Sequence, residues 1–405
     1  MTVEIRPCKD KEELADYGRI VSYVFASTEG MDEELASTQP DWTTCGFVDG
    51  KMAATMGAWP FTVRLNGAPV PMGGVTAVGT LPHYRRRGLL RGIMTEGLAT
   101  MRERGQPIAI LWASMGAIYQ RFGYGLAAES VTYSFDPRFA QLQRHVELPG
   151  TVEMLGVEEA LPVIKPLYIE YATPRNLMIH RAMPLWQQGA LKPRKKGEPV
   201  YVAVYRDEYG HPRGYITYWT YEERPTGPGG EQVLEVRDFV ALDLEAYQGL
   251  WEFIRRHDLA WKVVMRNVLP ADDIAPDLLL EPRMLSKQVG DAIWMRIVDA
   301  ERALAARPYS VRGELRIAID EDDMCPWNNG TFVLTSDGQT AMVERDENAA
   351  DIVVTPNGLA TLLSGRRSAT ELARTGRLAG ASEKALRLAD AMFATAHAPF
   401  CPDGF

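Results

Sequence analysis

The chain has 405 residues, of which 46% are hydrophobic and 24% are charged. This length exceeds the roughly 100 to 200 residues of a typical domain, and the composition is that of a folded protein, so a single small domain and a disordered chain are both excluded. Lysine and arginine total 44 against 53 for aspartate and glutamate, a net charge of −9. This charge disfavours nucleic-acid partners and favours cationic ones such as amines.

The cysteines and the chain start bear on the compartment. The four cysteines are widely separated, which predicts neither a zinc site nor a disulfide framework and favours a reducing compartment; they are Cys8, Cys45, Cys325 and Cys401. The first residues, MTVEIR, lack the basic and apolar segments of a signal peptide. The uncharged stretch 65–84 contains three prolines and four glycines, which rules out a spanning helix. We therefore expect a cytoplasmic protein without a membrane partner.

Residues 1–135 alternate helical and strand patterns, as in an α/β layer. A helix is predicted over 12–24, and strands over 44–47 and 53–65 surround the Asp49-Gly50 turn, with a second turn at Asn66-Gly67. The elements that follow are a buried strand over 72–80, a helix over 87–103, a central strand over 107–113 and a helical segment over 117–122.

After a connector at 137–150 the pattern returns in degraded form. Strands are predicted over 201–205, 214–220 and 231–242, and a helix over 246–257, which indicates an internal duplication. The first copy has Arg85-Arg86-Arg87-Gly88 between strand and helix, whereas the second has Asp243-Leu244-Glu245-Ala246. Only the first copy is therefore built to hold an anion.

From about residue 300 the pattern changes to a separate α+β unit. The predicted strands lie at 314–319, 330–334, 340–345 and 351–355, and the predicted helices at 356–364, 369–375 and 382–393. We therefore divide the chain into three domains at 1–135, 150–297 and 298–405.

The stretch 75–91 carries the clearest chemical signal. A strand ends, a short loop brings three arginines and a glycine, and a helix begins, so backbone N–H groups converge at the positive end of the helix. A pyrophosphate fits such a site, Gly88 lets the main chain approach it, and Arg86, Arg87 or Arg91 can neutralise its charge. The alternative is a solvated basic helix start.

This segment resembles the acetyl-CoA signature of the GNAT acetyltransferases, Arg/Gln-x-x-Gly-x-Gly/Ala, and departs from it where Leu90 replaces the small last residue. A second segment, SMGAIYQRFGYG at 114–125, and the layout of the chain are similar to the Eis (enhanced intracellular survival) subfamily. The resemblance implies a catalytic GNAT domain at 1–135, a degenerate second GNAT domain at 150–297 and a sterol-carrier-protein-like domain at 298–405. In the last domain, CPWNNGTF at 325–332 is similar to the strand and turn of that family.

The resemblance implies an acetyl-CoA site and no metal. The implied cofactor contacts are Val78, Gly79, Thr80, Arg86, Arg87, Gly88, Leu89, Leu90, Arg91, Ser114 and Met115. In GNAT proteins the strand is splayed or bulged near Val78, which frees an N–H for the thioester carbonyl and leaves room for the pantetheine arm. Met115 stands where better-studied members have an acidic residue.

Acetyl transfer to an amine needs a proton for the departing thiolate and an acceptor for the amine proton. By resemblance Tyr119 is the donor, because a phenol with a pKa of about 10 stays protonated at neutral pH. Tyr124 is a rival donor, and helix packing is the alternative role for Tyr119. In the resembled family the base is the C-terminal carboxylate, which here is that of Phe405. An α-carboxyl group has a pKa of roughly 3.5, so either burial must raise this pKa or a water must relay the proton. The alternative is that the terminus is frayed and has no role. None of the six histidines lies in a motif that would make it the base.

The acceptor site has weaker signals. Acidic residues could line a mouth for polycationic amines or form a solvated helix face; they are Asp403, Glu29, Asp32, Glu33 and Glu34. Trp42, Trp59 and Phe61 could line the cavity wall or pack in a core.

We therefore expect an N-acetyltransferase that moves an acetyl group from acetyl-CoA to primary amines of a cationic small molecule, aminoglycoside- or polyamine-like, by direct attack in a ternary complex. The resemblance also implies a homohexamer. The alternatives are a non-catalytic acyl-CoA sensor or scaffold, and an acyl or lipid carrier that acts through residues 298–405.

Overall fold

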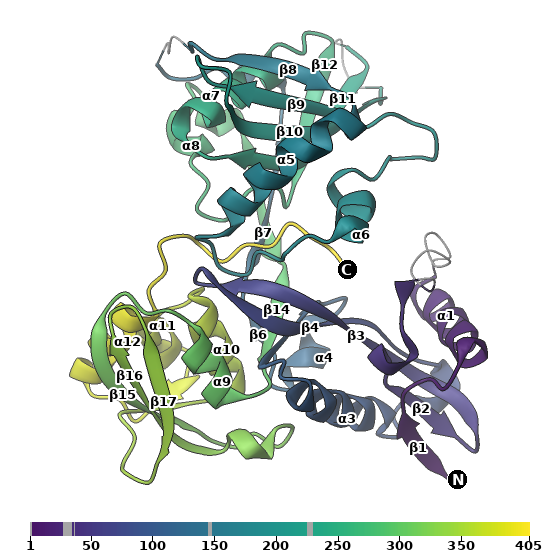
Figure 1. Ribbon diagram of the computed structural model, residues 1–405, viewed down its shortest axis with the longest axis vertical. Helices are drawn as coiled ribbons and strands as arrows, with labels where there is room; N and C mark the ends of the chain where they lie inside the picture. The colour runs from purple at the N-terminus through teal and green to yellow at the C-terminus, as the bar shows by residue number, and fades with distance from the viewer. Residues whose placement is uncertain (1, 27–34, 36, 145–147, 225–229) are drawn as a thin grey trace. The chain divides into compact units, whose positions relative to one another are not determined.

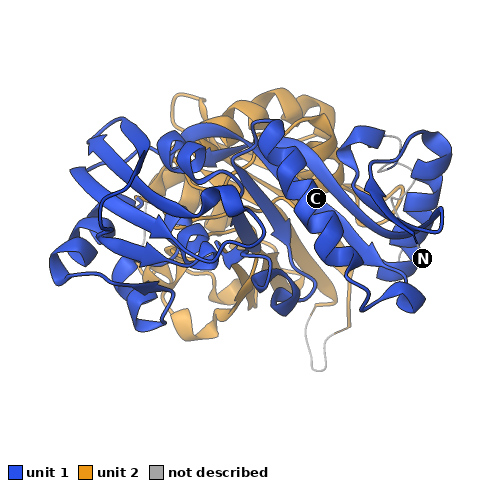
Figure 2. Ribbon diagram, turned by 90° about the horizontal axis from the view of Figure 1, so that it is seen from below, with its two compact units in different colours: residues 1–127, 293–395, 405 blue, residues 128–292, 396–404 orange. Residues whose placement is uncertain are grey.

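The computed structural model describes residues 2–26, 35, 37–144, 148–224 and 230–405. The chain divides into two compact units (Figure 2): residues 1–127, 293–395 and 405 form the first, and residues 128–292 and 396–404 form the second. Three sheets flanked by helices make up the described ranges, which confirms the predicted α/β and α+β character.

The first sheet is covered by helices on both faces. Its strand order is β1 (Val3–Arg6), β2 (Cys45–Val48), β3 (Lys51–Leu65), β4 (Ala68–Thr80), β5 (Ile108–Trp112), β14 (Ile293–Ile297) and β6 (Gly125–Leu126). α1 (Lys11–Phe25) packs on the face that carries Cys45 and Phe47, and α3 (Leu89–Glu103) packs on the face that carries Val48. Because successive side chains of a strand point to opposite faces, both faces are buried.

Local signals place these elements close to where the sequence predicts them. The turns Asp49-Gly50 and Asn66-Gly67 have φ values between 48° and 97°, the left-handed conformation that a type I′ hairpin turn requires. α1 begins after Asp10, whose side chain accepts two backbone N–H bonds from the first turn. α4 (Gly116–Gln120) is the short helix expected near 117–122.

Two strands lie in a different sheet from the strand that precedes them in the chain (Figure 1). β7 (Glu129–Phe135) follows β6 in sequence but pairs with β12 (Ala260–Arg266) and β13 (Ser286–Asp291) in the second sheet. β14 follows β13 in sequence but pairs with β5 and β6 in the first sheet. The predicted domain ranges 1–135, 150–297 and 298–405 stay predictions. In the structure, residues 129–135 belong to the second unit and residues 293–297 belong to the first. A short strand carries no local signal for which of two similar sheets it joins, because pairing depends on remote partners.

The second sheet repeats the hairpin, strand, helix and strand of the first. Its order is β13 (Ser286–Asp291), β7, β12 (Ala260–Arg266), β11 (Gln232–Ala241), β10 (Pro212–Glu222), β9 (Tyr201–Arg206) and β8 (Thr151–Leu155). The parallel pair β4 and β5 is connected by α3, and the parallel pair β11 and β12 is connected by α7 (Leu244–Arg255). α7 and α5 (Val157–Ala172) pack into separate cores on this sheet, and the short helices α6 (Met183–Leu185) and α8 (Ala275–Leu278) complete the unit.

The third sheet belongs to the first unit and confirms the α+β prediction for the last hundred residues. Its order is β17 (Ala341–Asp346), β16 (Gly330–Asp337), β15 (Arg312–Ile319), β18 (Ile352–Val354) and β19 (Leu378–Ala379). Its helices are α9 (Ala300–Ala306), α10 (Pro356–Ser364), α11 (Ala369–Arg374) and α12 (Glu383–Phe393).

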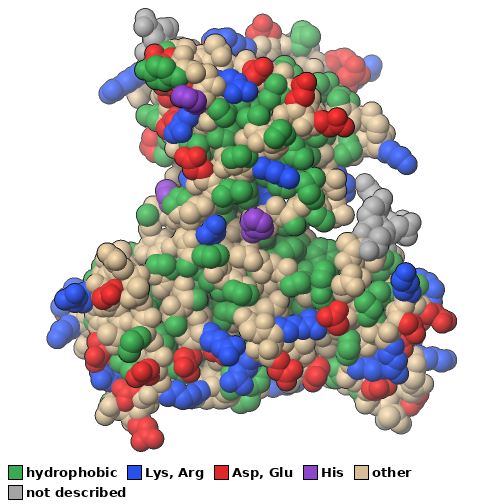
Figure 3. Space-filling view, viewed as in Figure 1, with side chains coloured by type: hydrophobic (Ala, Val, Ile, Leu, Met, Phe, Trp, Pro, Cys, Tyr) green, Lys and Arg blue, Asp and Glu red, His purple; other side chains and the backbone are tan. Residues whose placement is uncertain are grey.

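Charged side chains of both signs are mixed on the face drawn in Figure 3. On that face the acidic side chains lie among basic ones and do not form a single acidic patch. Among the helices of the described ranges, none combines the length and the apolar character needed to cross a membrane.

A buried arginine closes the C-terminal end of α12. Arg307 is fully buried, and its Nη atoms donate to the carbonyls of Pro308, Met392, Phe393 and Ala394 at 2.8 to 3.3 Å. A cation suits this position because the last carbonyls of a helix lack internal partners and carry partial negative charge.

We expect Arg307→Ala to lower the free energy of unfolding by about 3 kcal/mol or more, because buried carbonyls lose a charged donor. Urea denaturation followed by tryptophan fluorescence measures this loss. Arg387→Ala is the matched control, because Arg387 lies on α12 and forms an exposed ion pair with Glu383. Loss of this exposed pair should cost less than about 0.5 kcal/mol. Equal losses in the two variants would contradict the capping role.

Candidate active site

A β-bulge interrupts β4 at the position where the cofactor motif begins. Thr55 pairs with Gly79 and Gly57 pairs with Thr76, so two residues of β4, Ala77 and Val78, lie opposite one residue of β3. Ala77 has a φ of 51°, and the Thr55 hydroxyl donates to its carbonyl at 2.9 Å. A bulge turns the local backbone out of the ladder, which agrees with the distortion that the family resemblance implies near Val78.

β4 also separates from β5 before it reaches the bulge. The parallel pairing between these strands consists of Met72–Ile108, Gly73–Ala109 and Gly74–Ile110, whereas β4 continues to Thr80. In the described part of the sheet, the last six residues of β4 therefore have no partner on β5, and those outside the bulge pair with β3. On the β5 side their backbone groups are not used in a strand ladder, so a ligand can bond them.

The loop after β4 ends in an uncapped helix start. Arg86 and Gly88 both have positive φ, 63° and 81°, and no side chain caps the first turn of α3. The first intrahelical bond runs from the amide of Gly92 to the carbonyl of Gly88 at 3.0 Å, so the N–H groups of residues 89–91 have no partner within the helix. α3 begins at Leu89 and not at Arg87 as predicted, because the left-handed Gly88 is its N-cap.

The arginines of this loop lie at the surface. Arg85 Nε donates to the Thr80 carbonyl at 3.0 Å, and the Arg87 guanidinium lies 5.6 Å from the centre of the Tyr84 ring. Arg91 on the first turn of α3 forms an exposed pair with Asp323 at 3.4 Å. These cations can therefore reorient toward an anion at the helix start at little cost in lost contacts.

The other predicted cofactor residues lie around the same strands. Val78, Gly79 and Thr80 end β4. Leu89 and Leu90 begin α3, and the Leu89 side chain is buried whereas that of Leu90 is half-buried. Ser114 and Met115 follow β5 and are exposed, Met115 to 60%.

Tyr119 and Tyr124 form an aromatic pair behind this site. The Tyr119 side chain on α4 is 6% exposed, and its ring centre lies 5.7 Å from that of Tyr124 in an edge-to-face arrangement. Burial raises the pKa of Tyr119 to about 12. Burial raises the pKa of Tyr124 further, and the enclosed Tyr124 hydroxyl has no hydrogen-bond partner among the described residues. Both phenols thus keep their protons at neutral pH.

The third sheet's helix α10 supports the turn that follows Tyr119. Asn357 Nδ2 donates to the carbonyl of Gln120 at 2.8 Å and to the carbonyl of Tyr124 at 2.7 Å. These two bonds hold both ends of the short segment between α4 and β6. The sequence analysis missed Asn357, since an asparagine in the first turn of a helix has no signal for a remote partner.

The last residue of the chain packs beside the gap between β4 and β5. The Phe405 ring lies 5.1 Å from the Phe61 ring on β3, and Phe61 lies 6.1 Å from Trp59. A Cβ atom built on Gly74 would meet the Phe61 ring at 2.6 Å and the Phe405 ring at 3.1 Å. Gly74 is the residue at which β4 leaves β5, so the terminus lies at the start of the gap.

Asp403 does not supply the free acidic charge that the sequence suggested for an amine-binding mouth. Asp403 is 3% exposed and forms an ion pair with Arg181 in the second unit, so it cannot present a free charge to a cationic ligand. Its partner lies 222 positions earlier in the chain, and no local pattern indicates that pairing. Glu29, Asp32, Glu33 and Glu34 lie outside the described residues, and Trp42 lies in a short 3₁₀ helix.

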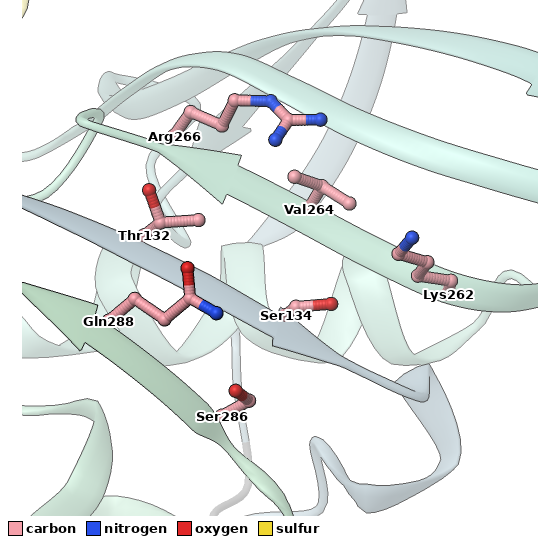
Figure 4. A pocket seen from close by; sticks show the side chains of 7 residues that line it. All are labelled: Thr132, Ser134, Lys262, Val264, Arg266, Ser286 and Gln288. Atoms are coloured by element: carbon pink, nitrogen blue, oxygen red, sulfur yellow. The ribbon is translucent and has the colours of Figure 1, made fainter.

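A hollow of about 190 Å³ lies on an uncovered face of the second sheet (Figure 4). The side chains that line it come from β7, β12 and β13; they are Thr132, Ser134, Lys262, Val264, Arg266, Ser286 and Gln288. None of the predicted site residues is among them. The hollow is polar and open, and it lies in the unit that lacks the arginine-rich loop.

Three regions of the chain match known domain families. Residues 4–127 match an acetyltransferase (GNAT) domain, residues 177–307 match a second acetyltransferase (GNAT) domain, and residues 300–402 match a sterol carrier protein domain. The order of these matches is the order that the sequence predicts.

Similar proteins span the whole chain. It is 31% identical to an uncharacterized N-acetyltransferase of Streptomyces avermitilis over 418 residues, with full coverage of both. It is 28% identical to the N-acetyltransferase Eis of Mycobacterium tuberculosis over 338 residues, which cover 80% of this chain and 79% of that protein. The crystal structures of Eis1 from Mycobacterium abscessus (TM-score 0.87, 28% identity) and a GCN5-related N-acetyltransferase from Anabaena variabilis (TM-score 0.89, 25% identity) each cover all of both chains.

The left-handed Ala77 gives a prediction about stored strain. An L-residue in this conformation costs about 1 to 2 kcal/mol, so Ala77→Gly should destabilise the protein less than Ala58→Gly by about that amount. Ala58 is a matched control because it is also buried, lies on β3 and has no positive φ. Urea denaturation of the two variants gives the difference. Equal destabilisation would show that Ala77 carries no strain.

Proposed function

Because this chain belongs to the Eis-like GNAT N-acetyltransferases, we propose that it moves the acetyl group of acetyl-CoA directly to a primary amine of a cationic small molecule, such as an aminoglycoside or a polyamine. The observation that carries this proposal is the packing of Phe405 on Phe61 beside Gly74, where β4 leaves β5. With the ring in this position, the C-terminal carboxylate proposed as the base would lie beside the strand proposed to hold the thioester.

The residues at β4 and α3 fit acetyl-CoA. The gap beyond Gly74 suits the narrow pantetheine arm, and the uncapped start of α3 with its nearby arginines suits the pyrophosphate. Arg86, Arg87 and Arg91 would neutralise the phosphates, Ser114 and Met115 would contact the cofactor beyond β5, and the Val78 N–H would bond the acetyl carbonyl oxygen. When bound, acetyl-CoA supplies the thioester carbon that the amine attacks.

Two groups of this chain would move protons. As the C–N bond forms and the C–S bond breaks, the Phe405 carboxylate accepts the amine proton, directly or through a water. The Tyr119 phenol gives its proton to the sulfur that departs. The raised pKa of Tyr119 keeps this proton in place at neutral pH, and Asn357 holds the segment that follows Tyr119.

The acceptor follows from charge and from the aromatic side chains near Phe405. A net charge of −9 attracts polycationic amines over a distance, and the rings of Trp59 and Phe61 offer cation–π contacts to an ammonium group. The family resemblance adds to the proposal a homohexameric assembly and a cytoplasmic location.

A panel of acceptors tests the proposed reaction. We expect coenzyme A release from acetyl-CoA with aminoglycosides and spermidine, and no release with neutral sugars of similar size, because attack needs an amine. Mass spectrometry of the products counts the acetyl groups gained, and a lysine-containing peptide tests protein acceptors. Tight acetyl-CoA binding without release from any amine would favour the non-catalytic sensor.

We expect Tyr119→Phe to lower kcat by about 10²-fold with little change in the KM for acetyl-CoA, because the departing thiolate loses its proton source. Tyr124→Phe is the matched control, since it removes the hydroxyl of the neighbouring ring. A larger loss in Tyr124→Phe than in Tyr119→Phe would assign the donor to Tyr124.

The pH profile of kcat checks the same assignment. A pKa near 12 means that the Tyr119 phenol stays protonated throughout the neutral and mildly alkaline range. The rate should therefore rise with pH as the amine loses its proton, and it should not fall before about pH 10. A fall near pH 8 that disappears in Tyr119→Phe would contradict the raised pKa.

An extension of the C-terminus tests the carboxylate. Two residues, Gly-Ser, added after Phe405 move the carboxylate away from the Phe61 contact, and we expect kcat to fall about 10²-fold. Phe405→Leu, which keeps a terminal carboxylate behind a smaller apolar side chain, should retain more activity than the extended chain. Full turnover by the extended chain would remove Phe405 from the mechanism.

A further inference from the structure

The second sheet has the same gap as the first but a different occupant. β11 and β12 pair in parallel from Gln232–Ala260 to Val236–Met265, after which β11 continues to Ala241 paired with β10 but not with β12. This arrangement repeats the separation of β4 from β5. The loop after β11 carries Asp243, which caps α7, in place of the arginines that follow β4. The second gap therefore lacks the cations that would hold a pyrophosphate.

The C-terminal segment 396–404 packs in this unit, next to the separated strands. In Figure 1 it runs, in yellow, below α5 and toward α6. The amide of Ala398 donates to Asp272 Oδ2 and the amide of Phe400 donates to the Asn176 carbonyl, both at 2.9 Å. Asn267 Nδ2, directly after β12, donates to the Cys401 carbonyl at 2.8 Å. Hydrogen bonds to backbone groups thus hold the segment at three positions, Ala398, Phe400 and Cys401.

Side chains of the segment complete the core beside these bonds. Phe400 is 1% exposed and packs in the cluster that α5 forms with β9 and β10. Cys401 is equally buried. A terminal segment that only frays would leave such apolar groups in water, so this segment is bound as part of the fold.

The strongest anchor is a buried ion cluster around Arg181. Arg181 Nε binds Asp403 Oδ1 at 2.7 Å, and both Nη atoms bind the carboxylate of Asp238, which lies on the part of β11 beyond its pairing with β12. The Tyr168 hydroxyl donates to the Ile179 carbonyl at 2.7 Å and also lies 3.1 Å from Asp403 Oδ2. The Tyr215 hydroxyl donates to Asp238 Oδ2 at 2.7 Å. Each oxygen of these two carboxylates therefore has a polar group within hydrogen-bond distance.

Charge makes this anchor specific for one register of the segment. Arg181, Asp238 and Asp403 are all buried, and the guanidinium also stacks 3.9 Å from the Tyr168 ring centre. A slip of the segment by one residue would take the carboxylate away from the Arg181 Nε donor, and a buried charged donor without a partner is costly. Phe405 is two residues beyond Asp403, so covalent geometry keeps the Phe405 Cα within about 7 Å of the Asp403 Cα.

We propose that the second GNAT domain is a binding site for this chain's own C-terminal segment, in the gap where a cofactor would lie, with Arg181 as the residue that recognises Asp403. The ligand class is an extended acidic peptide with an apolar residue three positions before the aspartate. If the proposed function holds, Arg181 and Asp403 are positioning residues for the terminal carboxylate, and this consequence alone rests on that function.

Digestion of the folded full-length protein by carboxypeptidase A tests the binding site without reference to activity. We expect slow release of Phe405 from the wild type and release at least 10-fold faster from Asp403→Ala, because the anchor is lost. Asp403→Ala leaves Arg181 paired with Asp238, so the rest of the unit should keep its fold, which thermal melting checks. Asp258→Ala, an exposed change in the same unit, is the control and should release Phe405 at the wild-type rate.

Hydrogen exchange gives a second measure of the same binding. The Phe400 amide, bonded to Asn176, should exchange at least 10-fold faster in Asp403→Ala than in the wild type. Equal digestion and equal exchange in the two proteins would overturn the binding site.

Turnover separates this inference from the proposed function. Faster digestion with a kcat at least 10-fold lower and an unchanged KM for acetyl-CoA supports both. Faster digestion with normal turnover supports the binding site and removes the terminal carboxylate from the mechanism.

Discussion

The separation of β4 from β5 at Gly74 is the constraint on which the first unit's site depends. A parallel pair that continued to Thr80 would bond the backbone groups that a ligand must reach. The bulge at Ala77 and Val78 lies on the part of β4 beyond this separation, and it contains a left-handed alanine that costs about 1 to 2 kcal/mol. Pairing of β3 with β4 on both sides of the bulge, together with the Thr55 hydroxyl, holds this strained residue in place.

The duplicated sheet shows how one backbone arrangement serves two uses. Both sheets open between a parallel pair of strands, but only the first is followed by arginines and an uncapped helix. In the second, Asp243 caps α7 and the C-terminal segment packs beside the strands. The ion cluster of Arg181, Asp238 and Asp403 is fully hydrogen-bonded, which is the condition under which a buried charge is tolerated.

The groups proposed to move protons and the groups proposed to hold acetyl-CoA come from different ranges of the chain. The residues proposed for acetyl-CoA lie within 78–115, on consecutive elements. Tyr119 lies beside Tyr124 and is supported by Asn357 from the third sheet's helix α10, and Phe405 reaches the same unit from the end of the chain. The region that matches a sterol carrier protein domain thus contributes a structural contact to the region that matches the first GNAT domain.

The sequence by itself determined the features that depend on neighbours within a few positions. The turns Asp49-Gly50 and Asn66-Gly67, the arginine and glycine loop, and the duplication were all predicted, because turn chemistry and periodicity are local. Only the tertiary structure decided that β7 and β14 exchange sheets, that Asp403 is buried on Arg181, and that Phe405 lies on Phe61. These contacts join residues far apart in the chain, and no local pattern records which remote surface will cover a given side chain.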